Sequence, residues 1–257
     1  MSDLTDEQFW DDYWRAVRVP TQIDLSVPFN RCLDSFFAPH LLGLPAGSAM
    51  FEIGCAPGRW LAHFSKKYGL SVGGLDYSPL GVQKTRENLK ALGVEAGVQQ
   101  ADFFKYEAGK KYDLVYSLGF IEHFDDVDGV VRRHLAMVKD GGLLILGIPN
   151  FQGIYKPIQA LYWQGCLDKH NLSIMRADFF PHLAERLGLE LLDCRYVGGF
   201  DPTLFVKPPK LGLARNLAIR LPLVVLRHLR QPALFDRFNS PLYSSYIMAA
   251  MRKPKSK

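Results

Sequence analysis

Phe51-Glu52-Ile53-Gly54-Cys55-Ala56-Pro57-Gly58 is the stretch that decides the fold, because an apolar run ends here in an acid and two glycines. This pattern is typical of a buried strand that turns into a ligand-binding loop. The glycines lack the Cβ atoms that keep a backbone away from a ligand. Their G-x-x-x-G spacing differs from the G-x-G-x-x-G of dinucleotide enzymes, and no Lys-Ser/Thr pair follows as in a P-loop. A phosphate is therefore not the expected ligand.

A second apolar run, 70–75, ends in Asp76 about twenty residues further on. Nucleotide-binding sheets place at this strand end the carboxylate that binds ribose hydroxyls. The two strand ends together predict a nucleoside site. A nicotinamide-dependent dehydrogenase stays open as an alternative on this evidence.

Length and composition agree with one large α/β domain: the chain has 257 residues, of which 48% are hydrophobic. Its first twenty residues are acidic and lack the apolar core of a secretory signal, which predicts a cytoplasmic protein. The four cysteines lie far apart without C-x-x-C spacing, so neither a disulfide framework nor a zinc site is expected. No apolar run reaches the roughly 18 to 20 residues that span a bilayer.

Strand-like apolar runs alternate with helix-like periodic segments, which predicts a parallel sheet covered on both faces. The predicted strands are 49–54, 71–76, 98–102, 112–117, 143–148, 189–196 and 243–251, and the predicted helices are 59–68, 79–92, 127–138 and 176–187. Ser78-Pro79 is a good helix start, with a capping serine followed by proline. Gly93 and Gly188 are good helix stops, because glycine adopts the left-handed conformation that ends a helix.

Five segments in order resemble the motifs of class I S-adenosylmethionine-dependent methyltransferases. They are 52–58, 75–78, 101–103, 112–115 with 119–124, and 139–143, the last of these as a turn before the fifth strand. The resemblance implies an α/β fold with a Rossmann-like, seven-stranded, mostly parallel sheet and helices on both faces. The last strand would run antiparallel between the fifth and sixth. One departure is Cys55-Ala56-Pro57, where the family often has a third glycine.

The resemblance implies S-adenosylmethionine as the cofactor. The glycine loop would place backbone amides against its methionine part, and the helix that follows would offer positive potential to its carboxylate. Asp76 would accept hydrogen bonds from the ribose, and Asp102 from the adenine amino group. Alternatively, each acid is a solvated loop residue. The residues expected to bind the cofactor are Glu52, Gly54, Cys55, Gly58, Asp76, Tyr77, Asp102, Phe103 and Ser117.

Methyl transfer from a sulfonium requires mainly positioning and removal of a proton. If the resemblance holds, His123 lies near the methyl group and is the best candidate for a general base, with Glu122 orienting it or facing the cofactor. His170 is a second, weaker candidate. Alternatively, Glu122 and His123 only cap a helix and line the pocket. A divalent metal could also be held by Glu122, His123, Asp125 and Asp126. Such a site is not expected, because carboxylates are favoured in the first turn of a helix.

Two segments outside the core are expected to bind the acceptor. We predict an N-terminal helical lid over 1–45 and a methyltransferase core over 46–257, with acceptor-side insertions at 151–175 and 198–240. The aromatics of 9–14 have helical spacing, so they either cover the cofactor or simply pack on the core. The 198–240 insertion contains seven basic and two acidic residues, a net charge of +5 that equals that of the whole chain.

The basic residues of 207–237 alternate with apolar runs, which suits two short amphipathic helices. These could cover an apolar acceptor, contact an anionic membrane surface or bind a phosphate-bearing substrate, or they could form a solvated face. A nucleic-acid partner is not predicted, because no base-reading motif is present. The location stays cytoplasmic, with membrane association left open.

The sequence therefore predicts methylation of a small molecule, preferably at a hydroxyl group. C-methylation of an isoprenoid or quinone-like ring is one alternative. A non-catalytic nucleoside sensor or scaffold that docks on a membrane or partner is another. The motifs indicate the cofactor, whereas the acceptor and the oligomeric state do not follow from them.

Overall fold

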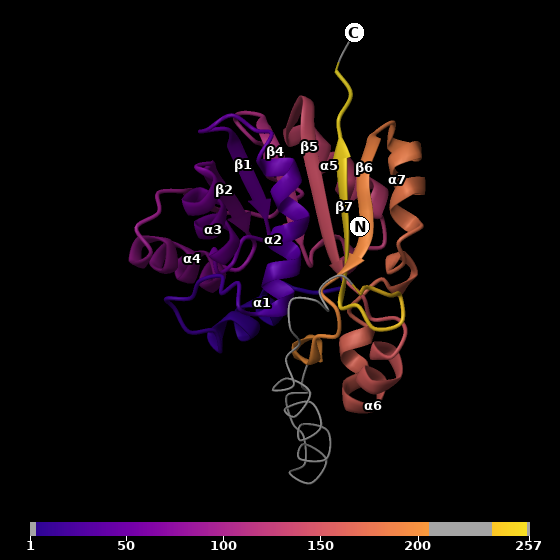
Figure 1. Ribbon diagram of the computed structural model, residues 1–257. Coiled ribbons are helices and arrows are strands. Elements are labelled where there is room, and N and C mark those ends of the chain that lie inside the picture. The colour runs from indigo at the N-terminus through magenta and orange to yellow at the C-terminus, as the bar shows by residue number, and fades with distance from the viewer. Residues whose placement is uncertain (1–3, 206–237, 256–257) are drawn as a thin grey trace.

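The computed structural model describes residues 4–205 and 238–255 (Figure 1). Within these ranges, seven strands form one sheet in the order β3-β2-β1-β4-β5-β7-β6. The strands are β1 Ala49–Ile53, β2 Ser71–Asp76, β3 Gly97–Gln100, β4 Tyr112–Leu118, β5 Val138–Pro149, β6 Glu190–Val197 and β7 Tyr246–Arg252. The pairs among β1 to β5 are all parallel, whereas β7 is antiparallel to both β5 and β6. The predicted seven-stranded sheet with an antiparallel last strand is confirmed.

Helices cover both faces of this sheet (Figure 1). They are α1 Glu7–Arg15, α2 Pro28–Leu41, α3 Arg59–Tyr68, α4 Pro79–Ala91, α5 Val127–Met137, α6 Tyr155–Leu167 and α7 Phe179–Leu187, with the 3₁₀ turns η1 Ile121–His123, η2 Leu172–Ile174 and η3 Pro202–Leu204. Successive side chains of a strand point to opposite faces. In β4, Val115 therefore packs with α5 and α7, while Leu114 and Tyr116 pack with α2 and α3.

The expected helix ends form as their residue types predict. The Ser78 hydroxyl accepts a hydrogen bond from the Gly81 amide at 2.8 Å and caps α4. Gly188 ends α7 with φ of +66°, a left-handed conformation that side chains with a Cβ rarely adopt. These local signals fix where the helices begin and end.

Some predicted boundaries were wrong. β3 ends at Gln100, so Asp102 lies in the following loop. The segment 139–142 is part of β5 rather than a turn before it, because Val138 already pairs with Tyr112 and a register shift follows. α6 was not predicted, since its apolar residues lack a clear helical period and its helix is interrupted at Trp163, where φ is −162° and ψ is 99°.

α1 and α6 lie near the lower end of the sheet in Figure 1, where β1, β2, β4 and β5 end. Segments from distant parts of the sequence thus lie near the carboxyl ends of the parallel strands. The basic stretch 207–237 and its predicted helices lie outside the described residues. Within 4–205 and 238–255, none of the helices combines the length and apolar character that crossing a bilayer requires.

Candidate active site

A cavity of about 350 Å³ lies at the carboxyl ends of the parallel strands. Open α/β sheets bind their ligands at this edge. The loops after β1, β2 and β4 form one part of its wall, which we call the donor part. Residues of α1, η1, α6 and the turn after α6 form the other, which we call the acceptor part.

Gly54 gives the donor part its bare backbone. Its φ is +73°, and a Cβ at this position would lie only 3.2 Å from the Phe120 ring. A side chain here would be strained and would narrow the cavity. Gly58 also has a positive φ, but a Cβ there would lie 2.8 Å from a methyl group of Thr85 in α4. Gly58 therefore allows α3 and α4 to pack closely, while Gly54 faces the ligand space.

Asp76 ends β2 with its carboxylate held by main-chain donors. Its two oxygens accept hydrogen bonds from the Ala56 and Ser78 amides, each at 3.0 Å. Burial raises the pKa of Asp76 to about 6, although these amides oppose the increase. The side chain lines the cavity and is mainly ionised at neutral pH, so it can accept further hydrogen bonds from a ligand.

Glu52 presents a buried acid to the same part of the cavity. The residue is 4% exposed, and its Oε2 atom has no hydrogen-bond partner among the described residues. Burial raises the pKa of Glu52 well above its usual value, and the nearby Asp76 carboxylate adds to this effect. An unpartnered buried oxygen is costly, so this atom is suited to a ligand that donates a hydrogen bond.

The other residues predicted for the cofactor divide into two groups. Tyr77 and Phe103 line the cavity. The described lining does not include Cys55, Asp102 or Ser117. Cys55 is buried against Gly74, Asp102 accepts a hydrogen bond from the Phe104 amide and pairs with Lys105, and the Ser117 hydroxyl bonds to the buried His134 ring.

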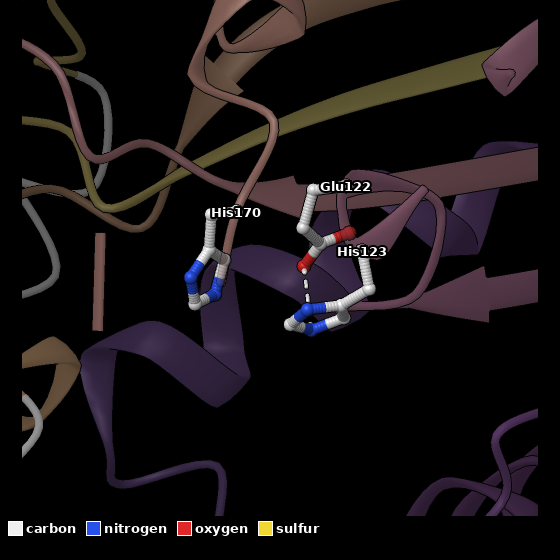
Figure 2. A group of neighbouring side chains, drawn as sticks. All are labelled: Glu122, His123 and His170. Atoms are coloured by element: carbon white, nitrogen blue, oxygen red, sulfur yellow. Dashed lines mark ion pairs between the residues drawn. The ribbon is translucent and has the colours of Figure 1, made fainter. Parts of the chain in front are cut away.

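The acceptor part contains Glu122, His123 and His170, whose ligand atoms lie within 4.8 Å of one another (Figure 2). Burial lowers the pKa of His123 to about 3, helped by the neighbouring His170, whose own pKa falls to about 4. Burial also raises the pKa of Glu122 to about 8. At neutral pH in this cavity both imidazoles are therefore uncharged and the carboxyl group is largely protonated.

The tautomer of His123 follows from its hydrogen bond. Its Nδ1 atom lies 2.8 Å from the carbonyl oxygen of Lys169. A carbonyl oxygen only accepts, so Nδ1 carries the hydrogen and donates it. The Nε2 atom of the neutral ring then has a free lone pair. This atom can therefore accept a hydrogen bond or bind a cation.

Asp126 does not join this cluster in the way a metal ligand would. Its carboxylate accepts a hydrogen bond from the Gly129 amide at 2.9 Å and caps α5. This is the position near a helix N-terminus that was expected for the acids of this loop.

α1 forms a cover over the cavity. Phe9, Trp10, Tyr13 and Trp14 all line it. The helix is attached at its middle, where Asp11 accepts a short hydrogen bond from the Ser78 hydroxyl. The aromatics predicted for a lid therefore lie in the wall of the cavity.

Several lining residues were not found from the sequence. Phe151 and Trp163 line the acceptor part, and Arg59 and Tyr246 complete the wall. Arg59 opens α3 directly after the glycine loop, which was a usable signal. Trp163 and Tyr246 reach the cavity only through tertiary packing, for which the sequence gives no local signal.

Comparison with known proteins agrees with the fold. Residues 31–193 match the family model described as "Methyltransferase domain", which is more than half of the chain. The protein therefore belongs to this methyltransferase family. It is a class I S-adenosylmethionine-dependent methyltransferase, and S-adenosylmethionine is its cofactor.

Individual relatives are distant. The chain is 24% identical over 250 residues to methyltransferase GfsG of Streptomyces halstedii, covering 94% of this chain and 86% of that protein. It is 30% identical over 106 residues to a ubiquinone biosynthesis O-methyltransferase of Methylobacterium sp. (strain 4-46), covering 41% of this chain and 42% of the relative. A solved S-adenosylmethionine-dependent methyltransferase of Thiobacillus denitrificans, in complex with S-adenosyl-L-homocysteine, aligns with a TM-score of 0.60 at 15% identity over 95% of this chain and 97% of that one.

Proposed function

We propose that this methyltransferase methylates a hydroxyl group of a small molecule and that His123 takes the hydroxyl proton. The observation that carries the proposal is the free Nε2 lone pair of a buried, uncharged histidine in the wall of the acceptor part. Its neighbour Glu122 has an oxygen 4.0 Å from that nitrogen (Figure 2). A mostly apolar wall that contains such an acceptor suits a largely apolar molecule that presents a hydroxyl.

The donor part fits the cofactor. We propose that the unpartnered Oε2 of Glu52 accepts a hydrogen bond from the amino group of its methionine part, beside Gly54. The N-terminus of α3, opened by Arg59, would offer positive potential to the carboxylate. Asp76 would bind the ribose, with Tyr77 and Phe103 as apolar walls.

The side chains of Cys55, Asp102 and Ser117 contact other residues and would have to turn toward the cavity to bind the cofactor. Gly58 supports the loop by packing against α4. Their predicted roles in cofactor binding stay predictions. When bound, S-adenosylmethionine supplies an activated methyl group.

The residues of the acceptor part then have two tasks. The aromatic wall holds the acceptor and excludes water, and His123 acts on the proton. The Nε2 atom of His123 would take the proton from the hydroxyl group that receives the methyl group. General-base assistance of this kind contributes roughly 10²- to 10⁴-fold to rate.

The proposal is tested by incubating the purified protein with S-adenosylmethionine and matched sets of alcohol, phenol, amine and carbon acceptors. S-adenosylhomocysteine formation is measured, and the methylated atom is located by NMR. We expect products only from hydroxyl acceptors, and His123→Ala should lower kcat roughly 100-fold or more with little change in cofactor affinity. A methylated carbon would favour the isoprenoid or quinone-like alternative. Cofactor binding without turnover on any acceptor would favour a sensor.

A membrane contact through 207–237 would be compatible with an apolar acceptor, and we keep it as part of the proposal. Salt-sensitive sedimentation with anionic vesicles is expected if this contact forms. If the protein does not sediment with the vesicles even at low salt, the proposed membrane contact is wrong.

A further inference from the structure

Glu122, His123 and His170 bring three ligand atoms to one place from two separate segments. Glu122 and His123 belong to η1, and His170 follows α6. Three atoms no more than 4.8 Å apart all lie within about 2.8 Å of a common point, because 4.8/√3 is about 2.8. Transition-metal ligands lie about 2.0 to 2.2 Å from the ion, so each side chain would need to move by less than about 1 Å.

Both histidines are oriented as metal ligands usually are. Nδ1 of His123 donates to the Lys169 carbonyl at 2.8 Å, and Nδ1 of His170 donates to the Cys166 carbonyl at 2.6 Å. A histidine that binds a metal typically donates its other ring N–H to a carbonyl or carboxylate, which fixes the tautomer and the ring orientation. Both His123 and His170 make such a hydrogen bond through Nδ1, so both Nε2 atoms are available to a ligand.

The carboxyl group of Glu122 is a second, independent indication that this group binds a ligand. The residue is 1% exposed, and neither carboxyl oxygen has a hydrogen-bond partner among the described residues. Figure 2 shows its carboxyl group directed toward the ring of His123, with His170 nearby. A buried, unpartnered carboxyl group costs free energy that a bound cation would offset.

The two segments are joined by main chain, so the group does not depend on side chains alone. The Asn171 amide donates to the Glu122 carbonyl at 2.6 Å, and the Asn171 side chain donates to the Phe124 carbonyl at 3.1 Å. These bonds hold the residue next to His170 against η1. The three ligands are therefore largely preorganised.

We propose that Glu122, His123 and His170 bind one divalent transition-metal ion, with its open coordination positions facing the acceptor part of the cavity. Two imidazoles and one carboxylate suit zinc or iron, whereas magnesium and calcium prefer oxygen ligands. This inference revises the expectation that no metal binds. It rests on the proposed function only for the role of the ion, which would bind the acceptor hydroxyl and lower its pKa so that the proton passes to water.

With the ion bound, Nε2 of His123 is a ligand and does not itself take the proton. The two roles of His123 therefore exclude each other, and they predict different responses to removal of metal. Direct catalysis by His123 requires no ion. The ion-bound form requires one for full turnover.

The test is titration of chelator-treated full-length protein with Zn²⁺ by calorimetry and with Co²⁺ by visible absorption. We expect one ion per chain, and Zn²⁺ should raise the unfolding temperature. His170→Gln should weaken Zn²⁺ binding roughly 100-fold or more, because one of three protein ligands is lost. His182→Gln changes an exposed histidine of α7 and is the matched control, expected to bind Zn²⁺ as the wild type does.

Circular dichroism and thermal unfolding of His170→Gln without metal establish that the variant is folded. The inference would be overturned if the wild type does not bind Zn²⁺, or if His170→Gln and His182→Gln both bind Zn²⁺ with the affinity of the wild type. The titration uses neither methyl donor nor acceptor, so failure to methylate a hydroxyl does not affect it. Full turnover by protein that binds no Zn²⁺ would overturn the metal site and leave O-methylation standing.

Discussion

The indole ring of Trp10 packs edge-on against the imidazole of His123, with ring centroids 5.2 Å apart and an interplanar angle of 85°. A second contact joins the same segments, because the Leu4 amide donates to the His123 carbonyl at 3.0 Å. The N-terminal segment thus contacts the residue proposed to act on the acceptor. These two contacts, together with the aromatic side chains of α1, hold the N-terminal segment at the site.

Trp10→Ala should lower kcat/KM roughly tenfold, which corresponds to about 1.4 kcal/mol of lost transition-state stabilisation. The physical reason is the loss of an aromatic contact and the entry of water beside His123. Steady-state kinetics with an identified acceptor measure the effect. Gln8→Ala, at an exposed position of the same helix, is the control. Equal kcat/KM for Trp10→Ala and wild type would show that α1 is only a packed helix.

Gly54→Ala should reduce affinity for S-adenosylhomocysteine and destabilise the fold by about 1 kcal/mol or more, because its φ of +73° is unfavourable for alanine. The new methyl group would also lie 3.2 Å from Phe120 at the cavity wall. Calorimetry and urea unfolding give the two quantities. Gly109→Ala has open space and no positive φ, so it should change neither. If Gly54→Ala binds S-adenosylhomocysteine as tightly as wild type, Gly54 does not contribute to cofactor binding.

Affinity for S-adenosylhomocysteine should decrease as pH falls below about 6, because the pKa of Asp76 in the free protein is about 6 and the ionised form accepts hydrogen bonds best. The decrease should approach roughly tenfold per pH unit. Asp76→Asn should bind more weakly at pH 8 and lose this dependence. Glu52 is present in both proteins, so the difference between their profiles reports on Asp76. Parallel profiles would contradict its role.

The same pKa predicts an effect on stability of the ligand-free protein. Since the pKa of Asp76 rises from 3.8 to about 6 on folding, its contribution is fully present below about pH 3.8 and is lost as pH rises through 6. Wild type should therefore lose about 2.4 kcal/mol relative to Asp76→Asn between pH 4 and 7, because part of the full effect of about 1.4 kcal/mol per pKa unit is already lost at pH 4. Urea unfolding at each pH measures this difference. A constant difference would mean that Asp76 is not desolvated.

Much of the fold was predictable because its signals are local. The apolar runs at β1, β2 and β4, and the cap at Ser78, depend on neighbours in sequence. The place of the last strand, between the fifth and sixth, came from the resemblance to a known family. α6 was missed because its packing at Trp163, rather than a helical period, determines its shape.

The candidate site was predictable in part. Glu52, Gly54 and Asp76 line the cavity because they occupy strand ends, whose direction a parallel sheet fixes. Asp102 lies beyond the end of a strand that was predicted two residues too long. The meeting of His170 with Glu122 depends on a main-chain bond from Asn171 across 49 residues of sequence, which no local pattern indicates.

The position of α1 has a consequence for the catalytic cycle. This one helix borders both the donor and the acceptor parts of the cavity through Trp10 and Trp14. Because the same helix borders the places of both ligands, we expect an ordered sequence of addition rather than independent binding. Departure of the spent donor would then require displacement of the helix, so product release can limit the overall rate.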